Sequence, residues 1–414
     1  MEPKIRLKGF GGEWEETKFD SLAKIRRGLT YSPSNITAKG VRVLRSSNVN
    51  EDTFITSEED VFVEEGCVNI PLANDGDILI TAANGSPRLV GKHAVIETNG
   101  SKMAPGGFMV LAMTDEPYFL NTCMSSPWYK KFLKTGVAGG NGAIGNLNKT
   151  SLSESMFYIP TDKVERDSLA SYFQHLDNLI LSTTKKIESL KQVKAASLQS
   201  MFPQEGETVP RVRFKGFNGE WEKVFVGKMG TTYSGLSGKT KDDFVIGNAR
   251  FITFLNVLSN AIIDTSILES VNVSEGEHQN EVRKGDLLFN TSSETPEEVG
   301  MCAVMDKDLK NVYLNSFCFG FRITDANIDS TFIAHLMRSH IGRRIMSILA
   351  QGATRYNLSK NSFCNTELLL PRTKEEQHQI ANYFTSLDSQ ITLHTQRLKK
   401  LKQIKSACLD YMFV

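Results

Sequence analysis

Two stretches of the chain carry the same long pattern of apolar residues. In residues 160–202 apolar side chains recur at alternating spacings of four and three, and residues 371–413 repeat the pattern 211 positions later without a gap. This spacing is typical of a coiled-coil seam, and neither stretch contains a Gly or Pro after its first residue. We predict two long helices that pack antiparallel through one seam: Leu169, Phe173, Leu176, Ile180, Ile187, Leu190, Ile380, Phe384, Leu387, Ile391, Leu398 and Leu401. Two unrelated amphipathic helices are the alternative, which the gapless repeat disfavours.

The repeat extends beyond the helices. Residues 8–15 (KGFGGEWE) return as residues 215–222 (KGFNGEWE), and Asn146-Leu147 with Lys149 returns as Asn357-Leu358 with Lys360. The chain is therefore two copies of one plan, in which a short motif precedes a globular domain and a long helix. The helices match better than the globular parts, which suggests a common helical frame that carries two recognition domains of different specificity. By the same symmetry, we expect the two chain termini to meet.

Each globular part has a mixed pattern of helical and strand periodicity. Helices are predicted at residues 19–26, 118–134 and 328–349, and strands at residues 41–45, 77–81, 93–97, 108–113 and 156–159. The predicted fold class is α+β, with two mixed α/β domains and an antiparallel coiled coil related by a pseudo-two-fold axis. The expected divisions are 1–160, 161–202, 203–370 and 371–414.

Composition favours a cytoplasmic globular protein. The chain has 414 residues, of which 40% are hydrophobic and 23% charged, and these values fit two or three domains. No run of about 18 apolar residues and no apolar leader segment is present, so neither a membrane span nor a signal peptide is expected. The six cysteines include no CxxC pair, which favours free thiols and gives no reason to expect a metal site.

Catalytic motifs are weak or missing. Residues 140–145 (GNGAIG) have glycines at dinucleotide-binding spacing, but no strand is predicted before them and no helix after them. Residues 85–93 (GSPRLVGKH) miss P-loop spacing by one residue. The seven histidines are scattered. We expect no catalytic residue and no metal ligand in this chain.

Basic residues gather in the globular parts although the net charge is only +1. Such side chains suit DNA phosphates, whereas Arg, Asn and Gln also suit base edges. The candidates are Arg26, Arg27, Lys39, Arg42, Arg45, Arg88, Lys92, Lys130, Lys131, Lys134, Lys149, Arg338, Arg343, Arg344, Arg355 and Lys360. The ordinary alternative is a solvated surface. Residues 291–299 are acidic, which argues against phosphate contacts there.

Taken in order, these features resemble the specificity subunit of type I restriction–modification systems. The resemblance rests on the KGFxGEWE openings, the Gly-Asp-Ile/Leu-Leu turns, the Asn-Leu-x-Lys segments, and Pro371 followed by Glu376, Gln377 and Ile380. The first helix departs from the family pattern because it lacks the Glu-Gln pair.

The resemblance implies two target recognition domains that each read half of a bipartite, non-palindromic DNA site. It also implies helices that dock two modification subunits, which methylate adenine with S-adenosylmethionine. Restriction subunits using ATP and Mg²⁺ are an optional addition, and this chain itself needs no cofactor. The alternatives are a duplicated coiled-coil scaffold that does not read DNA, and an enzyme with an unrecognised site. Specific, salt-dependent binding to duplex DNA would distinguish a DNA-recognition subunit from a scaffold.

Overall fold

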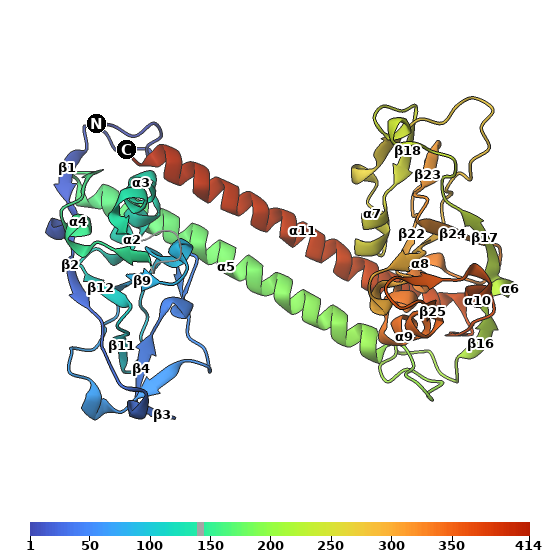
Figure 1. Ribbon diagram of the computed structural model, residues 1–414, viewed down its shortest axis with the longest axis horizontal. Helices are drawn as coiled ribbons and strands as arrows, with labels where there is room; N and C mark the ends of the chain where they lie inside the picture. Colours follow the sequence, from blue (N-terminus) through green and yellow to red (C-terminus); the bar gives the residue numbers. More distant parts are fainter. Residues whose placement is uncertain (139–144) are drawn as a thin grey trace. The chain divides into compact units, whose positions relative to one another are not determined.

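The computed structural model of the protein describes residues 1–138 and 145–414 (Figure 1). The chain forms two compact units: unit 1 comprises Met1–Lys185 with Gln396–Val414, and unit 2 comprises Lys186–Thr395. Each unit contains part of both long helices, so the units cut across the sequence divisions given above. The predicted mixed α+β class is confirmed. None of the helices in the described residues is long and apolar enough to cross a membrane.

Unit 1 is built on two four-stranded sheets. The first is antiparallel, and its strands in spatial order are β10 (His93–Val95), β8 (Ile78–Thr81), β12 (Met109–Met113) and β2 (Lys24–Arg27). Strand β8 is buried at all four positions because both faces of the sheet are covered: Ile78 and Ile80 pack into one apolar cluster and Leu79 into another. The second sheet has the order β11 (Met103–Pro105), β4 (Val41–Leu44), β7 (Val61–Val63) and β3 (Ile36–Thr37).

Unit 2 repeats this arrangement with different residues. Its antiparallel sheet has the order β22 (Cys302–Val304), β20 (Leu287–Asn290), β24 (Cys318–Ile323) and β17 (Gly230–Ser234). Its second sheet has the order β23 (Val312–Leu314), β18 (Ala249–Ile252) and β19 (Glu269–Val271). The antiparallel sheets of the two units have the same strand order, and the three strands of the second sheet in unit 2 correspond to β11, β4 and β7 of unit 1, as the sequence repeat predicts.

Smaller sheets and short helices complete each unit. In unit 1 they are β1 (Glu15–Lys18) with β15 (Met156–Ile159), β5 (Val49–Asn50) with β6 (Thr53–Phe54), β13 (Val137–Ala138) with β14 (Gly145–Leu147) and β9 (Ala83–Asn84), and α4 (Lys149–Ser153). In unit 2 they are β16 (Glu222–Phe225) with β27 (Glu367–Leu370), β21 (Ser292–Ser293) with β26 (Tyr356–Leu358) and β25 (Ala350–Gln351), and helices α6 (Val226–Met229), α7 (Phe254–Ser259) and α10 (Lys360–Cys364).

Three predicted helices are shorter than expected. Helix α1 (Phe19–Leu22) is a single turn, because Ala23 is extended and the following residues join the sheet as β2. The predicted helix at 118–134 is two helices, α2 (Pro117–Ser125) and α3 (Pro127–Gly136), which break at Ser126 before a proline. In unit 2 the helix predicted at 328–349 breaks likewise at Ser339, into α8 (Ser330–Arg338) and α9 (His340–Leu349).

The long helices are α5 (Lys163–Ser200) and α11 (Lys374–Met412). Within unit 1 the Tyr172 hydroxyl lies 3.3 Å from Cys408 Sγ, and Asp177 pairs with Lys405 at 2.7 Å. Contacts that advance along α5 while they recede along α11 mean that the two segments run antiparallel.

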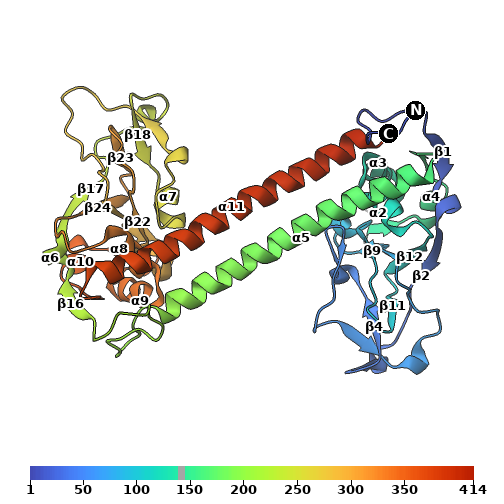
Figure 2. The same cartoon turned by 180° about the vertical axis from the view of Figure 1, so that it is seen from behind.

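The same holds within unit 2, where Lys194 of α5 pairs with Asp388 and the Ser197 hydroxyl lies 2.9 Å from the Tyr383 hydroxyl. Figures 1 and 2 show the backbone course of α5 and α11. The predicted antiparallel pairing is therefore confirmed inside each unit.

The apolar seam packs into the globular cores as well as between helices. In unit 1, Leu169, Phe173 and Leu176 share one buried cluster with the end of α11. In unit 2, Leu190, Ile380, Phe384 and Leu387 do the same with the end of α5. Ile187 is buried, and four other seam residues are half-buried: Ile180, Ile391, Leu398 and Leu401.

Each opening motif is fixed to the start of a long helix by a buried ion pair. Arg6 donates through Nε and Nη2 to the Glu165 carboxylate at 2.8 and 2.7 Å, and its other donors reach the carbonyls of Gly11 and Gly12. Arg213 repeats this arrangement with Glu376, at 2.8 Å for both contacts. Glu165 and Glu376 are 1% and 2% exposed, so both motifs are anchored by an enclosed, doubly bonded arginine.

The family departure at the first helix has a structural counterpart. In unit 2, Gln377 accepts from the backbone N–H of Asp329, the residue that caps α8, and donates to the Pro371 carbonyl. In unit 1 the matching residue is Arg166, which donates to the carboxylate of Glu116 before α2 and to the Pro160 carbonyl. An ion pair therefore replaces an amide contact in the first copy.

Candidate nucleic-acid interface

A groove of about 730 Å³ opens between the two main sheets of unit 1. Its polar lining includes Tyr31, Arg45 and Asn84, and Phe108 lies on it from the β11–β12 turn. Arg45 donates to the Tyr31 hydroxyl at 2.6 Å, and Asn84 donates to the Ser46 hydroxyl at 3.2 Å. We call the groove formed by Tyr31, Arg45, Asn84, Gly85 and Phe108 the Phe108 groove. It combines a cation, amide and hydroxyl groups, and an aromatic ring.

Two more basic residues lie next to each other in the same domain. Arg27 ends β2, four residues before Tyr31, and Lys149 begins α4. Burial, and then the positive charge of Arg27, lower the pKa of Lys149. Arg27, Arg45 and Lys149 have no ion-pair partner among residues 1–138 and 145–414. Their uncompensated charge favours an anionic ligand.

Unit 2 presents a matching set of groups, which we call the Phe317 face: Ser234, Ser292, Phe317, Arg355 and Lys360. The Arg355 guanidinium lies 5.9 Å from the centre of the Phe317 ring, and its Nε donates to the Ser292 hydroxyl at 3.3 Å. Lys360 donates to the Ser234 hydroxyl at 2.8 Å. Arg355 and Lys360 form no ion pair with any residue that the structure describes. Both were among the sequence candidates.

Phe108 and Phe317 were not among those candidates. They stand 209 positions apart, each directly before the last strand of its antiparallel sheet, and are 66% and 57% exposed. The signal that could have found them is an aromatic residue retained at matching positions of the repeat, within otherwise different sequence.

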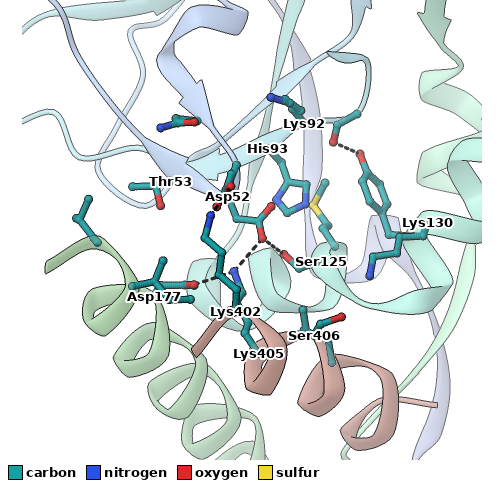
Figure 3. Close-up of a pocket in the computed structure, with 18 of the residues that line it drawn as sticks. Asp52, Thr53, Lys92, His93, Ser125, Lys130, Asp177, Lys402, Lys405 and Ser406 are labelled. Atoms are coloured by element: carbon teal, nitrogen blue, oxygen red, sulfur yellow. Dashed lines mark hydrogen bonds and ion pairs between the residues drawn. The ribbon is translucent and has the colours of Figure 1, made fainter. Parts of the chain in front are cut away.

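A second cavity of unit 1, of about 640 Å³, lies where the domain meets both long helices (Figure 3). Lys405 of α11 pairs there with Asp52 at 2.9 Å and with Asp177 of α5 at 2.7 Å. Burial alone would lower the pKa of Lys405, but the two carboxylates outweigh it and raise the pKa. Lys405 therefore holds the β5–β6 hairpin to both helices.

The basic candidates Arg88, Lys92 and Lys130 line this second cavity and not the Phe108 groove (Figure 3). Lys131 and Lys134 are exposed on the same helix as Lys130, and Lys39 is exposed before β4. Of the candidates in unit 1, only Arg45 is among the residues that line the Phe108 groove. Arg27 and Lys149 lie close to each other in the same domain.

Arg338 and Arg343, both predicted as DNA contacts, are bound to the backbone of their own domain in the structure. Arg338 donates to the backbone carbonyls of Cys302, Val257, Leu258 and Asn260 at 2.6–3.2 Å. Arg343 donates to the carbonyls of Glu297, Val299 and Gly300. Burial lowers the pKa of each guanidinium to about 10. Nε and Nη2 of Arg338 and all three nitrogens of the Arg343 guanidinium donate to backbone acceptors, which gives both arginines a structural role.

Three other candidates are tied to neighbours. Arg26 donates to the Leu72 carbonyl at 3.0 Å. Arg42 pairs with Asp60 and stacks on the Phe62 ring at 4.7 Å. Arg344 pairs with Glu205 at 2.6 Å on the surface. These contacts leave less of each cation available for phosphate.

Among the described residues, no group of three or more His, Cys, Asp or Glu side chains could hold a metal ion. The glycine-rich segment at 140–145 lies outside the described residues except for Gly145, which begins β14. None of the six cysteines, all of which are described, forms a disulfide.

Comparison with protein families gives one match. Residues 218–403 match the family model of the type I restriction modification DNA specificity domain. This stretch of the chain is therefore similar to that domain family. The matched stretch covers the second domain and most of α11, and the internal repeat relates the first domain to it.

One solved structure supports the fold of the whole chain. The crystal structure of a type I restriction–modification S subunit from M. genitalium is 14% identical, with a TM-score of 0.62, and the match covers 100% of this chain and 99% of that one. The HsdS subunit from Thermoanaerobacter tengcongensis is also 14% identical and covers 97% and 96% of the two chains, with a TM-score of 0.44. The likeness of fold rests on the first of these.

Proposed function

We propose that this chain is the DNA-reading subunit of a type I restriction–modification complex and that each globular domain reads one half of a bipartite site. The observation that carries the proposal is a similar set of groups in the two domains. The Phe108 groove and the Phe317 face each offer one or more cations that form no ion pair with the described residues, polar side chains, and a phenylalanine at the matching position of the repeat. Cations suit phosphates, and amide and hydroxyl groups suit base edges. Because the two sets differ in their residues, the two half-sites differ in sequence.

The long helices are the docking surface for two modification subunits in this proposal. Those subunits would transfer a methyl group from S-adenosylmethionine to adenine, and restriction subunits would use ATP and Mg²⁺ when present. This chain would supply recognition only. The buried Arg6–Glu165 and Arg213–Glu376 pairs support a fixed frame on which the domains can vary.

The test is methylome sequencing of cells that carry this chain with its modification partner. Wild type should yield one bipartite, non-palindromic methylated site. Replacing the first domain by that of a relative should change one half-site and leave the other. If both half-sites change, or neither does, the assignment of one half-site to each domain is wrong. Absence of methylation together with absence of specific duplex binding would favour a scaffold.

The structure sets the boundaries of that exchange. Residues 16–158 would be the natural cassette from the sequence, but this cut separates Glu116 from Arg166. A cassette that spans residues 15–166 keeps this ion pair and the β1–β15 pairing within one donor sequence. The shorter cassette is the matched control and should give less folded protein with the same change of half-site.

A further inference from the structure

The two exposed phenylalanines, Phe108 and Phe317, are the strongest unexplained feature of the surface. Phe108 lies in the short turn between β11 and β12, and Phe317 lies in the short turn between β23 and β24. Scattered exposed apolar residues are normal on proteins. Two large aromatic rings at matching positions of diverged domains, both beside unpaired cations, call for a common cause.

The backbone of each phenylalanine is held while its ring is not. The Phe108 carbonyl accepts from the backbone N–H groups of Ala82 and Ala83 at 2.9 and 3.0 Å. The Phe317 carbonyl accepts from the Thr291 backbone N–H and hydroxyl at 2.9 and 2.8 Å. The exposed rings cannot be explained by core packing, whereas the anchored backbone gives each ring a fixed base from which to project.

The neighbours of each ring indicate its ligand. Arg45 lies with Phe108 in one groove, and Arg355 lies over the Phe317 ring. Phenylalanine has no hydrogen-bonding group, so it cannot bind phosphate. Apolar contact with a thymine methyl group or insertion between base pairs is what such a ring can make on a duplex.

We infer that Phe108 and Phe317 are the apolar base-contacting residues of the two domains, and that each buries its ring against the bases of its own half-site. This inference rests on the proposed function. The cations beside each ring hold phosphates and set the salt dependence, while the ring contributes a contact that carries no charge. Each phenylalanine thus acts on one half-site only.

The test compares Phe108→Ala and Phe317→Ala with wild type in the full-length chain assembled with its modification subunits. Duplexes would carry the site identified by methylome sequencing. Each variant should bind the site about ten-fold or more weakly, with an unchanged salt slope and unchanged affinity for a random duplex. Phe225→Ala is the matched control, because Phe225 is also exposed, at 43%, but ends the two-stranded sheet of β16. It should bind as wild type does.

Two DNA substitutions identify the contact. Replacing single thymines by uracil removes one methyl group. If this change weakens DNA binding by the wild-type protein but not by Phe108→Ala, Phe108 contacts a thymine methyl group in the first half-site. A rise in 2-aminopurine fluorescence on wild-type binding, absent with Phe108→Ala, assigns insertion between bases. Phe317→Ala should show the same behaviour in the other half-site only.

Failure of the inference can be distinguished from failure of the proposed function. If wild type shows no specific duplex binding, the proposed function fails. If wild type binds specifically and both alanine variants match it, the phenylalanines do not contact bases. A variant that loses affinity together with its salt slope also overturns the inference. Thermal unfolding should be unchanged in both variants because the rings are exposed.

Discussion

Trp14 meets Phe413 edge-on, with ring centres 5.8 Å apart and planes inclined by 80°. The Ile5 backbone N–H also donates to the Tyr411 carbonyl at 2.9 Å. Trp221 and Phe202 form the matching contact in unit 2, at 6.3 Å and 88°. Both chain termini therefore lie together in unit 1 (Figure 1). The corresponding place in unit 2 is the connection between the end of α5 and the second opening motif. The expectation that the termini meet is confirmed.

A circular permutant should fold and recognise the same DNA. A short linker would join Val414 to Met1, and new termini would open between Glu205 and Gly206, both exposed in the matching connection of unit 2. Circular dichroism and methylome sequencing check the outcome. A permutant opened inside α2, which is almost wholly buried, is the control and should not fold. If the permutant opened at Glu205 also fails to fold, breaking the chain there is as harmful as breaking it inside a buried helix.

Glu165→Gln should destabilise the protein by about 3–5 kcal/mol, because it leaves the Arg6 guanidinium charged without its buried partner. Asp167→Asn, which removes the exposed pair with Lys163 on the same helix, should cost at most about 1 kcal/mol. Denaturant unfolding measures both. Equal costs would show that the Arg6 contact is no stronger than a surface pair.

His335 should make the protein sensitive to acid. Burial, and then the charges of Lys194 and Arg338, lower the pKa of His335 to about 3, from an ordinary value of 6.5. Between these pH values the unfolded chain binds a proton that the folded chain excludes, so stability falls as pH drops from about 6.5 toward 3. The slope reaches about 1.4 kcal/mol per pH unit inside this window.

His335→Phe should remove this contribution, since the ring packs 5.2 Å from Phe384 and neither nitrogen has a hydrogen-bond partner among the described residues. Thermal unfolding at pH 7 and pH 4.5 measures the difference. His335→Gln also lacks the titrating group and should lose the same pH dependence without the gain in packing. An unchanged pH profile in both variants would place the acid sensitivity elsewhere.

Arg338→Met should affect stability and leave the salt dependence of DNA binding as it is. The variant leaves up to four backbone carbonyls without their hydrogen-bond donor. Each buried carbonyl left unpaired should lower the free energy of unfolding by on the order of 1–3 kcal/mol. Arg355→Ala and Lys360→Ala should do the reverse and lower the slope of log K against log salt by about one each. A flattened slope in Arg338→Met would return that residue to the DNA interface.

The long helices were predictable because their evidence is local. A seam such as Leu169, Phe173 and Leu176 needs only spacing and a lack of breakers to be seen. The internal repeat gave the domain plan in the same way. Helix breaks were harder to see. Pro127 was visible in the sequence, but Ser339 ends α8 in extended geometry without any proline to announce it.

The candidate site depends on directions that spacing does not encode. Arg338 and Arg343 look like a basic helix face in sequence, yet both turn inward to carbonyls of distant loops. Lys360 looks the same in sequence and reaches an exposed hydroxyl instead. Only the tertiary arrangement separates these cases. Counting charges therefore finds the right residue types and cannot sort them.

The Arg166–Glu116 ion pair, and its replacement by Gln377 and Asp329 in the second copy, also constrains how the gene can recombine. A crossover between the two repeats that falls between codons 116 and 166 would combine partners from different copies. Arg166 would then face Asp329, or Glu116 would face Gln377. Crossovers on either side of that interval keep each pair intact. Exchange of new DNA-reading cassettes into this frame should therefore have breakpoints that avoid those fifty codons.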